Sequence, residues 1–327
     1  MATRMRRLAP PVIAGLAVLV ALLGLIGTAI RDPHPHDLRV GLVGPAPAIQ
    51  EITSAFASNA PGVFAFTSYS SEADARAAID SRDIDAALLL GQSPHLVVAG
   101  SAGDANTGVI TAALTNVFQA QGAKLDVEVV HPFFAGDAHG LVLFFVVVAV
   151  IISSLVVQAV LLATREVSLA MRLTVVLAFA VLAGPVAMGT ADWIAGDYGS
   201  GLWSAIGLLM LASAAVGAVV AGLVRLLGRP GFGLGALVVV LLDLVSSGGP
   251  AGSQFLPDLY RSMAPWMPAA QLYSGLRGAL YFDGSGVGSP IVVLAAWLAS
   301  GLVLMLVGEL VFSLTHRSAP VSQPAHQ

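Results

Sequence analysis

The chain has 327 residues, of which 57% are hydrophobic and only 10% are charged, and its formal net charge is −4. A soluble domain carries about 25% charged residues. The composition therefore excludes an ordinary soluble enzyme built around one buried core. The chain has no cysteine, which also excludes disulfides and thiolate metal sites.

Six apolar runs predict the fold. A helix needs roughly 20 apolar residues to cross a bilayer, and the runs fall at 11–30, 141–163, 173–191, 203–224, 232–248 and 290–314. We expect a polytopic α-helical membrane protein with six transmembrane helices and an extracytoplasmic α/β domain inserted between helices 1 and 2. The expected divisions are an N-terminus at 1–10, helix 1 at 11–30, the inserted domain at 31–139, a five-helix region at 140–314 and a tail at 315–327.

The first run has the arginine-led pattern of both a signal peptide and a signal anchor. Its apolar stretch is long for the central region of a signal peptide, and Thr28-Ala29-Ile30 is a poor cleavage site. These two features favour an uncleaved anchor.

Basic residues predict the orientation. Eight arginines precede the first run, follow the last run, or lie in the short loops after the second and fourth runs. The loop at 192–202 has none, and 249–289 has only Arg261 and Arg277. The positive-inside rule then predicts that both termini are cytoplasmic and that the insert lies outside. High Ala, Gly, Val and Arg usage with a single lysine indicates a GC-rich bacterial source, so we expect a multi-pass protein of the bacterial cell (inner) membrane. The eight arginines are Arg4, Arg6, Arg7, Arg165, Arg172, Arg225, Arg229 and Arg317.

The insert has a mixed α/β pattern. Apolar runs or alternation predict strands at 38–43, 63–69, 84–90, 96–99 and 124–129. Helical spacing predicts helices around Ile49, after Ser71, and around Ile110, and Ser71 with Asp74 forms a capping-box pattern. The expected order is β-α-β-α-β-β-α-β. Twelve acidic residues against five basic ones argue against nucleic acid as a partner.

Motifs for catalysis are missing from the sequence. It contains neither a phosphate-binding G-x-x-x-x-G-K-[ST] nor a zinc-binding H-E-x-x-H, and no histidine falls within an apolar run. We therefore expect no enzyme activity, no cofactor and no metal. The segment 32–37, Asp-Pro-His-Pro-His-Asp, has ligands for a divalent metal but is more typical of a proline-stiffened linker.

Polar residues near the C-terminal runs are the candidate site. Asp243 and Glu309 lie within apolar runs, where a carboxylate either reaches the interface or serves a transport pathway. A small-residue turn at 246–250 leads into an aromatic stretch, and helical spacing after Pro268 predicts interfacial or re-entrant helices within 250–282. This segment is either a structural cap or an outer gate. The candidate substrate-path residues are Asp243, Ser246, Ser247, Gly248, Gly249, Pro250, Tyr273, Arg277, Tyr281 and Glu309.

These segments carry a family resemblance. The stretches RLLGRPG (225–231), SSGGP (246–250), LP (256–257), PWMP (265–268) and YSGLR (273–277) resemble the C-terminal half of ABC-2-type transporter permeases, closest to the phage-infection-protein (Pip-like) branch. One span, an α/β domain and five further spans are similar to the same branch. The chain departs from many ABC-2 permeases in having only residues 1–10 before its first span, where they carry an amphipathic cytoplasmic helix.

The resemblance implies an exporter subunit without its own nucleotide-binding motif. It would pair with a separate ABC ATPase and a second permease, as a homodimer or heterodimer, and move a lipid, glycan, peptide or drug-like substrate outward through the membrane lipids. The loop with Arg165, Glu166 and Arg172 resembles a coupling helix for the ATPase, although it also fits an ordinary positive-inside loop. The alternatives are a membrane-anchored receptor or scaffold, or an ATP-independent accessory of a lipid exporter, acting through the outer domain.

Overall fold

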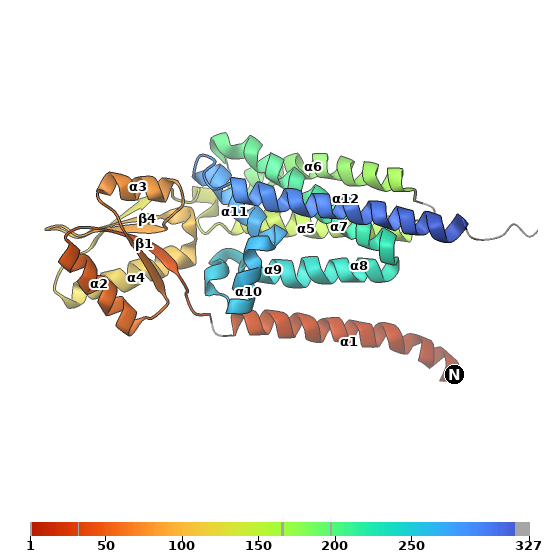
Figure 1. Ribbon diagram of the computed structural model, residues 1–327, viewed down its shortest axis with the longest axis horizontal. Helices are drawn as coiled ribbons and strands as arrows, with labels where there is room; N and C mark the ends of the chain where they lie inside the picture. Colours follow the sequence, from red (N-terminus) through yellow and green to blue (C-terminus); the bar gives the residue numbers. More distant parts are fainter. Residues whose placement is uncertain (1, 32, 165–166, 197, 318–327) are drawn as a thin grey trace, which may run out of the picture.

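The computed structural model describes residues 2–31, 33–164, 167–196 and 198–317. The protein is mostly helical, with one five-stranded sheet. Figure 1 shows the sheet and its helices at one end of an elongated helical bundle. We call the end of the bundle that adjoins the sheet the sheet end, and the opposite end the far end.

The α/β region, residues 38–130, follows the element order predicted from the sequence. Its sheet has the order β2-β1-β3-β4-β5, and only the β3–β4 pair is antiparallel. The strands are β1 (Leu38–Val43), β2 (Phe64–Ser68), β3 (Ala86–Leu89), β4 (His95–Ala99) and β5 (Asp126–Val130). The helices are α2 (Ala46–Asn59), α3 (Glu72–Asp80) and α4 (Asp104–Ala120).

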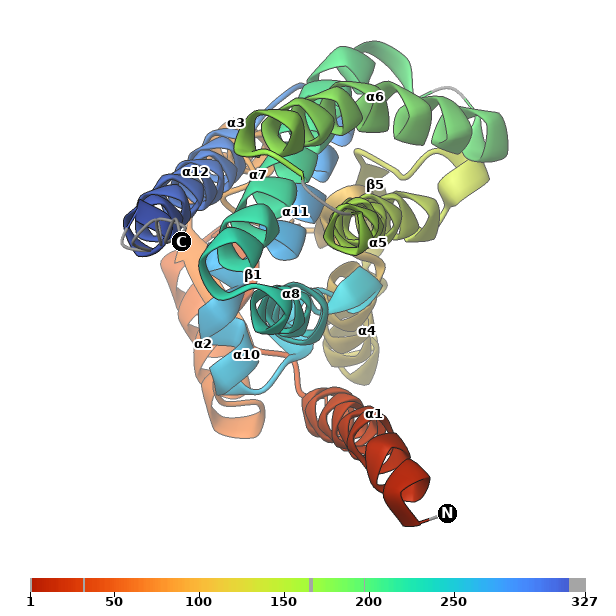
Figure 2. The same cartoon turned by 90° about the vertical axis from the view of Figure 1, so that its right-hand side faces the viewer.

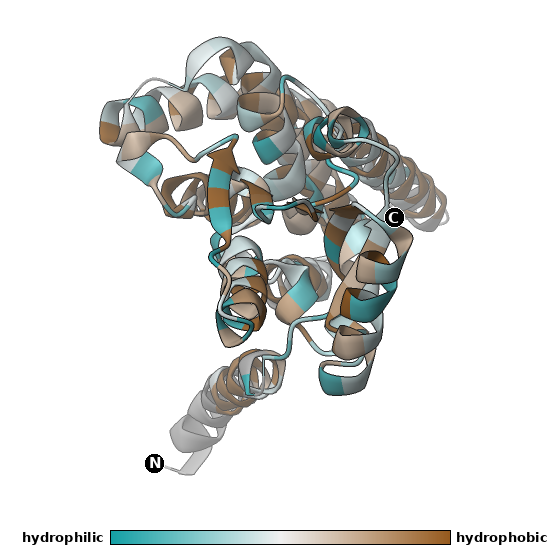
Figure 3. Ribbon diagram, turned by 90° about the vertical axis from the view of Figure 1, so that its left-hand side faces the viewer, coloured by the Kyte–Doolittle hydropathy of each residue, from teal (hydrophilic) through white to brown (hydrophobic). Residues whose placement is uncertain are grey.

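Local signals explain these elements. The Ser71 side chain accepts a hydrogen bond from the Asp74 backbone N–H at the start of α3, as the capping box predicts. Alternate residues of the strands form two cores. One core joins β1, β3 and β4 to α2 and α4, whereas the other joins the opposite face to α3 and to the bundle. Viewed from the sheet end, hydrophilic and hydrophobic residues alternate along the α/β region (Figure 3).

Among the residues that the structure describes, five stretches are long and apolar enough to cross a membrane, which indicates a membrane protein. They overlap the last five predicted runs and are Leu141–Ala163, Leu169–Ala195, Gly199–Leu227, Arg229–Ser246 and Gly288–Leu314. The corresponding helices are α5 (Leu141–Ala163), α6 (Leu169–Ala195), α7 (Leu202–Leu227), α8 (Arg229–Ala236), a π-helical segment (Leu237–Asp243), α9 (Leu244–Ser246) and α12 (Gly288–Arg317).

The predicted first crossing corresponds to α1 (Ala2–Ile30), within which Gly15–Ala29 is a shorter apolar stretch. Leu25 and Ala29 of α1 pack against Leu256 and Tyr260. Figure 2 shows α1 at the side of the bundle. That α1 also crosses the membrane, which would make six crossings, stays a prediction.

Helix α7 lies at the centre of the bundle and packs closely on α12. A Cβ atom added at Gly301 would overlap the backbone of Ala218 and Val219, and one at Gly222 would lie 2.6 Å from the Leu304 Cβ. Glycine on each helix therefore allows the two backbones to approach each other.

Two short helices, α10 (Asp258–Met263) and α11 (Pro268–Tyr281), connect α9 to α12 at the sheet end. Short 3₁₀ turns complete the connections, at Gly100–Ala102, Ala135–Asp137, Gly199–Gly201, Gly249–Ala251, Ser253–Phe255 and Ala264–Trp266. Helix α11 packs against α5, α7 and α12.

Candidate functional site

The candidate site is centred on α11. The sequence predicts one row with leucines and an adjacent row with Tyr273, Arg277 and Tyr281, in a helix that is either interfacial or re-entrant. In the structure both rows are enclosed: Leu272 and Leu276 are buried, and so are Tyr273 and Tyr281. Because three long helices surround it, α11 lies within the sheet end of the bundle rather than flat across it.

Asp243 fixes the start of α11. Its side chain is fully buried, and its Oδ1 accepts a hydrogen bond of 2.6 Å from the Ala269 backbone N–H. Pro268 precedes Ala269 at the first helical position, where a missing N–H costs nothing. A carboxylate at this end also complements the helix dipole. Asp243 is thus a buried cap and does not reach the interface.

The turn after Asp243 is closed by its own hydrogen bonds. The Ser246 hydroxyl donates to the Asp243 carbonyl, and the Ser247 hydroxyl donates to the Leu244 carbonyl and accepts from the Gly249 N–H. Gly248 has a φ of 71°, and a Cβ there would overlap Gly252. The small residues of 246–250 therefore allow the chain to make a tight turn, which leads through Pro250 toward α10.

Arg277 contacts one of the two predicted tyrosines. Its guanidinium carbon lies 5.0 Å from the Tyr273 ring centroid, in cation–π range. Tyr281 instead packs on Phe133 and Phe134, with ring centroids 5.4 and 4.7 Å away. Tyr281 therefore does not share the Arg277 contact, because the segment leading into α5 brings two phenylalanines against its ring.

Arg277 also contacts the α/β region. Its Nη1 donates to the Ala102 carbonyl over 2.5 Å, and Ala102 lies in the turn between β4 and α4. The Tyr273 hydroxyl donates to the Gly140 carbonyl just before α5, over 3.3 Å. These bonds connect α11 both to the sheet and to the bundle.

Sequence reasoning missed Arg82, which contacts α11 from the α/β region as Arg277 contacts the α/β region from α11. From the turn between α3 and β3 its guanidinium donates to the Ser274 carbonyl and hydroxyl, each at 3.0 Å, and to the Ser285 carbonyl at 3.3 Å. Burial, followed by the charges of Arg277 and Arg39, lowers the pKa of Arg82 to about 9. The only signal in the sequence is an arginine beside a buried strand, which by itself does not identify its partner.

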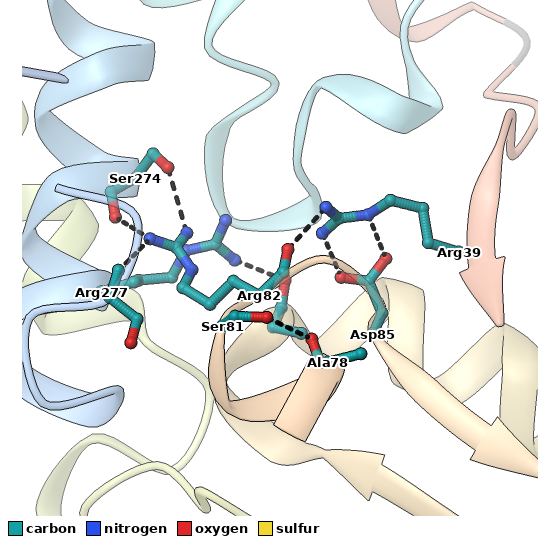
Figure 4. A network of polar contacts seen from close by, with 9 residues as sticks. Arg39, Ala78, Ser81, Arg82, Asp85, Ser274 and Arg277 are labelled. Carbon is teal, nitrogen blue, oxygen red and sulfur yellow. Dashed lines mark hydrogen bonds and ion pairs between the residues drawn. The ribbon is translucent and has the colours of Figure 1, made fainter. Parts of the chain in front are cut away.

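Arg39 and Asp85 extend this network (Figure 4). Arg39 holds the buried Asp85 carboxylate with two hydrogen bonds, Nη2 to Oδ1 at 2.6 Å and Nε to Oδ2 at 3.3 Å. Its Nη1 donates to the Arg82 carbonyl at 2.7 Å. Three guanidinium groups and one carboxylate therefore gather where the α/β region meets α11.

The remaining candidate residues lie at the far end. Glu309 of α12 pairs with Arg225 of α7 at 2.7 Å, and the Arg225 guanidinium carbon lies 4.0 Å from the Phe312 ring centroid. Arg172 of α6 is buried and donates to the Gln158 side chain of α5 over 3.2 Å. Arg165 and Glu166 lie outside the described residues. The structure therefore separates Glu309 and Arg172 from the residues around α11.

Ionisable residues in and near the histidine-rich linker pair with separate partners. Asp37 pairs with Arg261, His131 with Asp80 and His139 with Asp104. Asp32 lies outside the described residues. Within the parts of the chain that the structure describes, no three His, Asp or Glu side chains are grouped for a metal.

An apolar groove of about 730 Å³ runs between α5 and α6. Its lining extends from Leu141 to Ser153 on α5 and from Phe179 to Ile194 on α6, so it lies toward the sheet end. Among the described residues, Ser153 and Thr190 are its only polar lining residues, and the Thr190 hydroxyl donates a hydrogen bond to the Val186 carbonyl. The groove is therefore suited to a hydrocarbon chain.

Comparisons with protein-family models, curated proteins and solved structures find no match to this chain.

Proposed function

We propose that the chain is the membrane-spanning permease subunit of an ABC-2-type exporter. The observation that carries this proposal is the buried helix α11, whose 14 residues are too few to cross a membrane. Interrupted helices at membrane depth are tolerated where protein buries them or where they line a cavity, and in transporters they form substrate sites and gates. The resembling segments at 246–250, 265–268 and 273–277 all belong to α11 or its approach.

The proposed orientation follows the arginine distribution. Both termini face the cytoplasm of a bacterial cell, α1 also crosses the membrane and brings the number of crossings to six, and the α/β region lies outside. The sheet end is then the outer end, and α11 serves as the outer gate. The chain pairs with a second permease and with a separate ATPase, which contacts the loop containing Arg165 and Glu166.

The groove between α5 and α6 favours one class of substrate. Its apolar volume of about 730 Å³ suits an acyl chain, and its position beside the gate suits a molecule that leaves through the outer half of the membrane. Among a lipid, a glycan, a peptide and a drug-like molecule, we therefore favour the lipid.

Co-expression with an ABC ATPase, to be sought among the neighbouring genes, tests the proposal. We expect the two proteins to purify together and to move a fluorescent phospholipid in an ATP-dependent way in proteoliposomes. Arg165→Glu combined with Glu166→Arg should abolish the complex, whereas Arg261→Glu, at the opposite end of the bundle, should leave it intact. A chain that inserts normally yet binds no ATPase would instead support a receptor, a scaffold or an ATP-independent accessory.

The gate has its own test in the same proteoliposomes. Arg277→Ala should reduce transport by at least fivefold, because it removes the contacts with Tyr273 and Ala102. Arg261→Ala should have little effect, since Arg261 bonds only to the exposed carboxylates of Asp37 and Asp258. Equal transport at matched expression would make α11 a structural lid.

A further inference from the structure

A small cavity lies where the α/β region meets α11. Its volume is about 20 Å³, room for a single water-sized group. The lining includes the side chains of Arg39, Arg82, Asp85, Gln254 and Arg277. Residues far apart in the sequence therefore form one polar enclosure.

The charges around this cavity do not balance. Asp85 is the only carboxylate in its lining and is held by Arg39. Arg82 bonds to two carbonyls and a hydroxyl, and Arg277 bonds to one carbonyl. Neutral acceptors satisfy N–H groups without cancelling charge, so three guanidiniums and one carboxylate leave a formal excess of two positive charges.

One donor in the cluster also lacks an acceptor. The Arg277 Nε is buried and has no hydrogen-bond partner within the described part of the chain. A buried donor without an acceptor is costly, and a buried charge without a counter-charge is more so. Burial is the main cause of the lowered pKa of Arg82, and the neighbouring charges of Arg277 and Arg39 lower it further.

We infer that Arg82 and Arg277, with Arg39 at the margin, form a binding site for a phosphate-type oxyanion. Guanidinium groups match phosphate oxygens in geometry as well as in charge. The cavity admits one oxygen atom, and the Arg39 side chain, which is 42% exposed, marks the side from which the rest of the anion approaches.

The phosphate group has two chemically equivalent sources. It can belong to a lipid headgroup, because α11, which contributes Arg277 to the cavity, lies at the sheet end of the apolar bundle, or it can be free phosphate. In either case the anion bridges Arg82 of the α/β region and Arg277 of α11, and so joins the two parts more firmly. The site does not depend on the proposed export function, because binding is measured without an ATPase.

Binding of inorganic phosphate to the purified full chain in a maltoside detergent provides the first arm of the test. Isothermal titration in chloride-free buffer should show saturable binding, weakened at least tenfold in both Arg277→Gln and Arg82→Gln. Arg277→Lys keeps the charge but loses the paired N–H donors of the guanidinium. Its affinity for phosphate should lie between those of the native chain and Arg277→Gln. The matched control is Arg261→Gln, whose arginine already faces two carboxylates, and its affinity should stay within twofold of the native value.

A second arm separates the two sources. Phosphatidylglycerol added to the micelles should raise the melting temperature of the native chain more than that of Arg277→Gln if the headgroup is the ligand. Free phosphate should raise the melting temperature of the native chain more than that of Arg277→Gln if free phosphate is the ligand. Either response supports the site. The inference is overturned if neither probe distinguishes the native chain from Arg277→Gln and Arg82→Gln, or if chloride binds as tightly as phosphate.

Discussion

At the scale of single residues, two buried carboxylates have defined structural partners, although the Asp243 Oδ2 has no hydrogen-bond partner within the described residues. Asp243 caps α11 and Asp85 holds Arg39. An apolar run interrupted by an acidic residue predicts that the residue has a partner. It does not identify the partner, because the Ala269 N–H that binds Asp243 is a backbone group that no side-chain pattern reveals.

Replacing Asp243 tests its role as a cap. Asp243→Ala removes the acceptor of the Ala269 N–H and should destabilise the protein by about 1–2 kcal/mol, the usual cost of a lost N-cap. Asp243→Asn keeps an acceptor oxygen and nearly the same volume, so its melting temperature should stay close to the native one. Fluorescence-detected thermal unfolding in detergent measures both. A drop as large for Asn as for Ala would mean that the negative charge, rather than the hydrogen bond, stabilises the helix start.

A surface carboxylate gives a pH-dependent prediction. Hydrogen bonds from Arg76, supplemented by His95, lower the pKa of Glu128 to about 2. The folded pKa is below the unfolded value of about 4.3, so this stabilisation is present above about pH 4.3 and is lost as the pH falls toward about 2. Between pH 6 and pH 3 the melting temperature of Glu128→Gln should therefore fall less than that of the native chain.

Glu51→Gln is the control for this measurement. Glu51 is exposed and forms no ion pair within the described residues. Its substitution should leave the pH profile of the native chain unchanged. Identical profiles for Glu128→Gln and the native chain would show that the Arg76 pair contributes no stability.

At the scale of elements, the predictable parts were those whose burial follows a simple period. The strand at Leu38–Val43 was predicted with its observed bounds, and the cap at Ser71 marked the start of α3. Helix α11 did not follow a simple period, because α5, α7 and α12 bury it around most of its circumference. The pattern of apolar residues alone left both an interfacial and a re-entrant helix open, and tertiary packing decides for a buried helix.

The contact between α7 and α12 gives the prediction for this scale. Gly301→Ala places a methyl group against the backbone of Val219, and overpacking of this kind costs about 1–3 kcal/mol. Gly189→Ala is the matched control, since Gly189 lies within α6 with open space around its Cβ position. Alanine is the better helix former, so this variant should be as stable as the native chain or slightly more so. Equal melting temperatures for the two variants in detergent would show that α7 and α12 can separate without loss of stability.

At the scale of the whole molecule, the sequence predicted the order of elements but not the contacts between its parts. Arg82 and Ser274 are 192 residues apart and meet only because the α/β region rests on the sheet end of the bundle. A single sequence does not show which positions vary together, so it contains no signal for such a contact. Arg277 could be selected from its aromatic neighbours, whereas Arg82 and Arg39 became candidates only through their shared cavity.

The orientation of the whole chain is the last prediction. Eight arginines in the segments expected to be cytoplasmic predict that the α/β region faces outward. The chain has no cysteine, so single cysteines can be introduced without altering existing thiols. Gln121→Cys, at an exposed position after α4, should react with a membrane-impermeant maleimide on intact cells. Ser318→Cys, in the C-terminal tail, should react only after the membrane is permeabilised. Labelling of position 318 but not 121 on intact cells would mean that the protein is inserted the opposite way, with α11 and the arginine cluster at the cytoplasmic face.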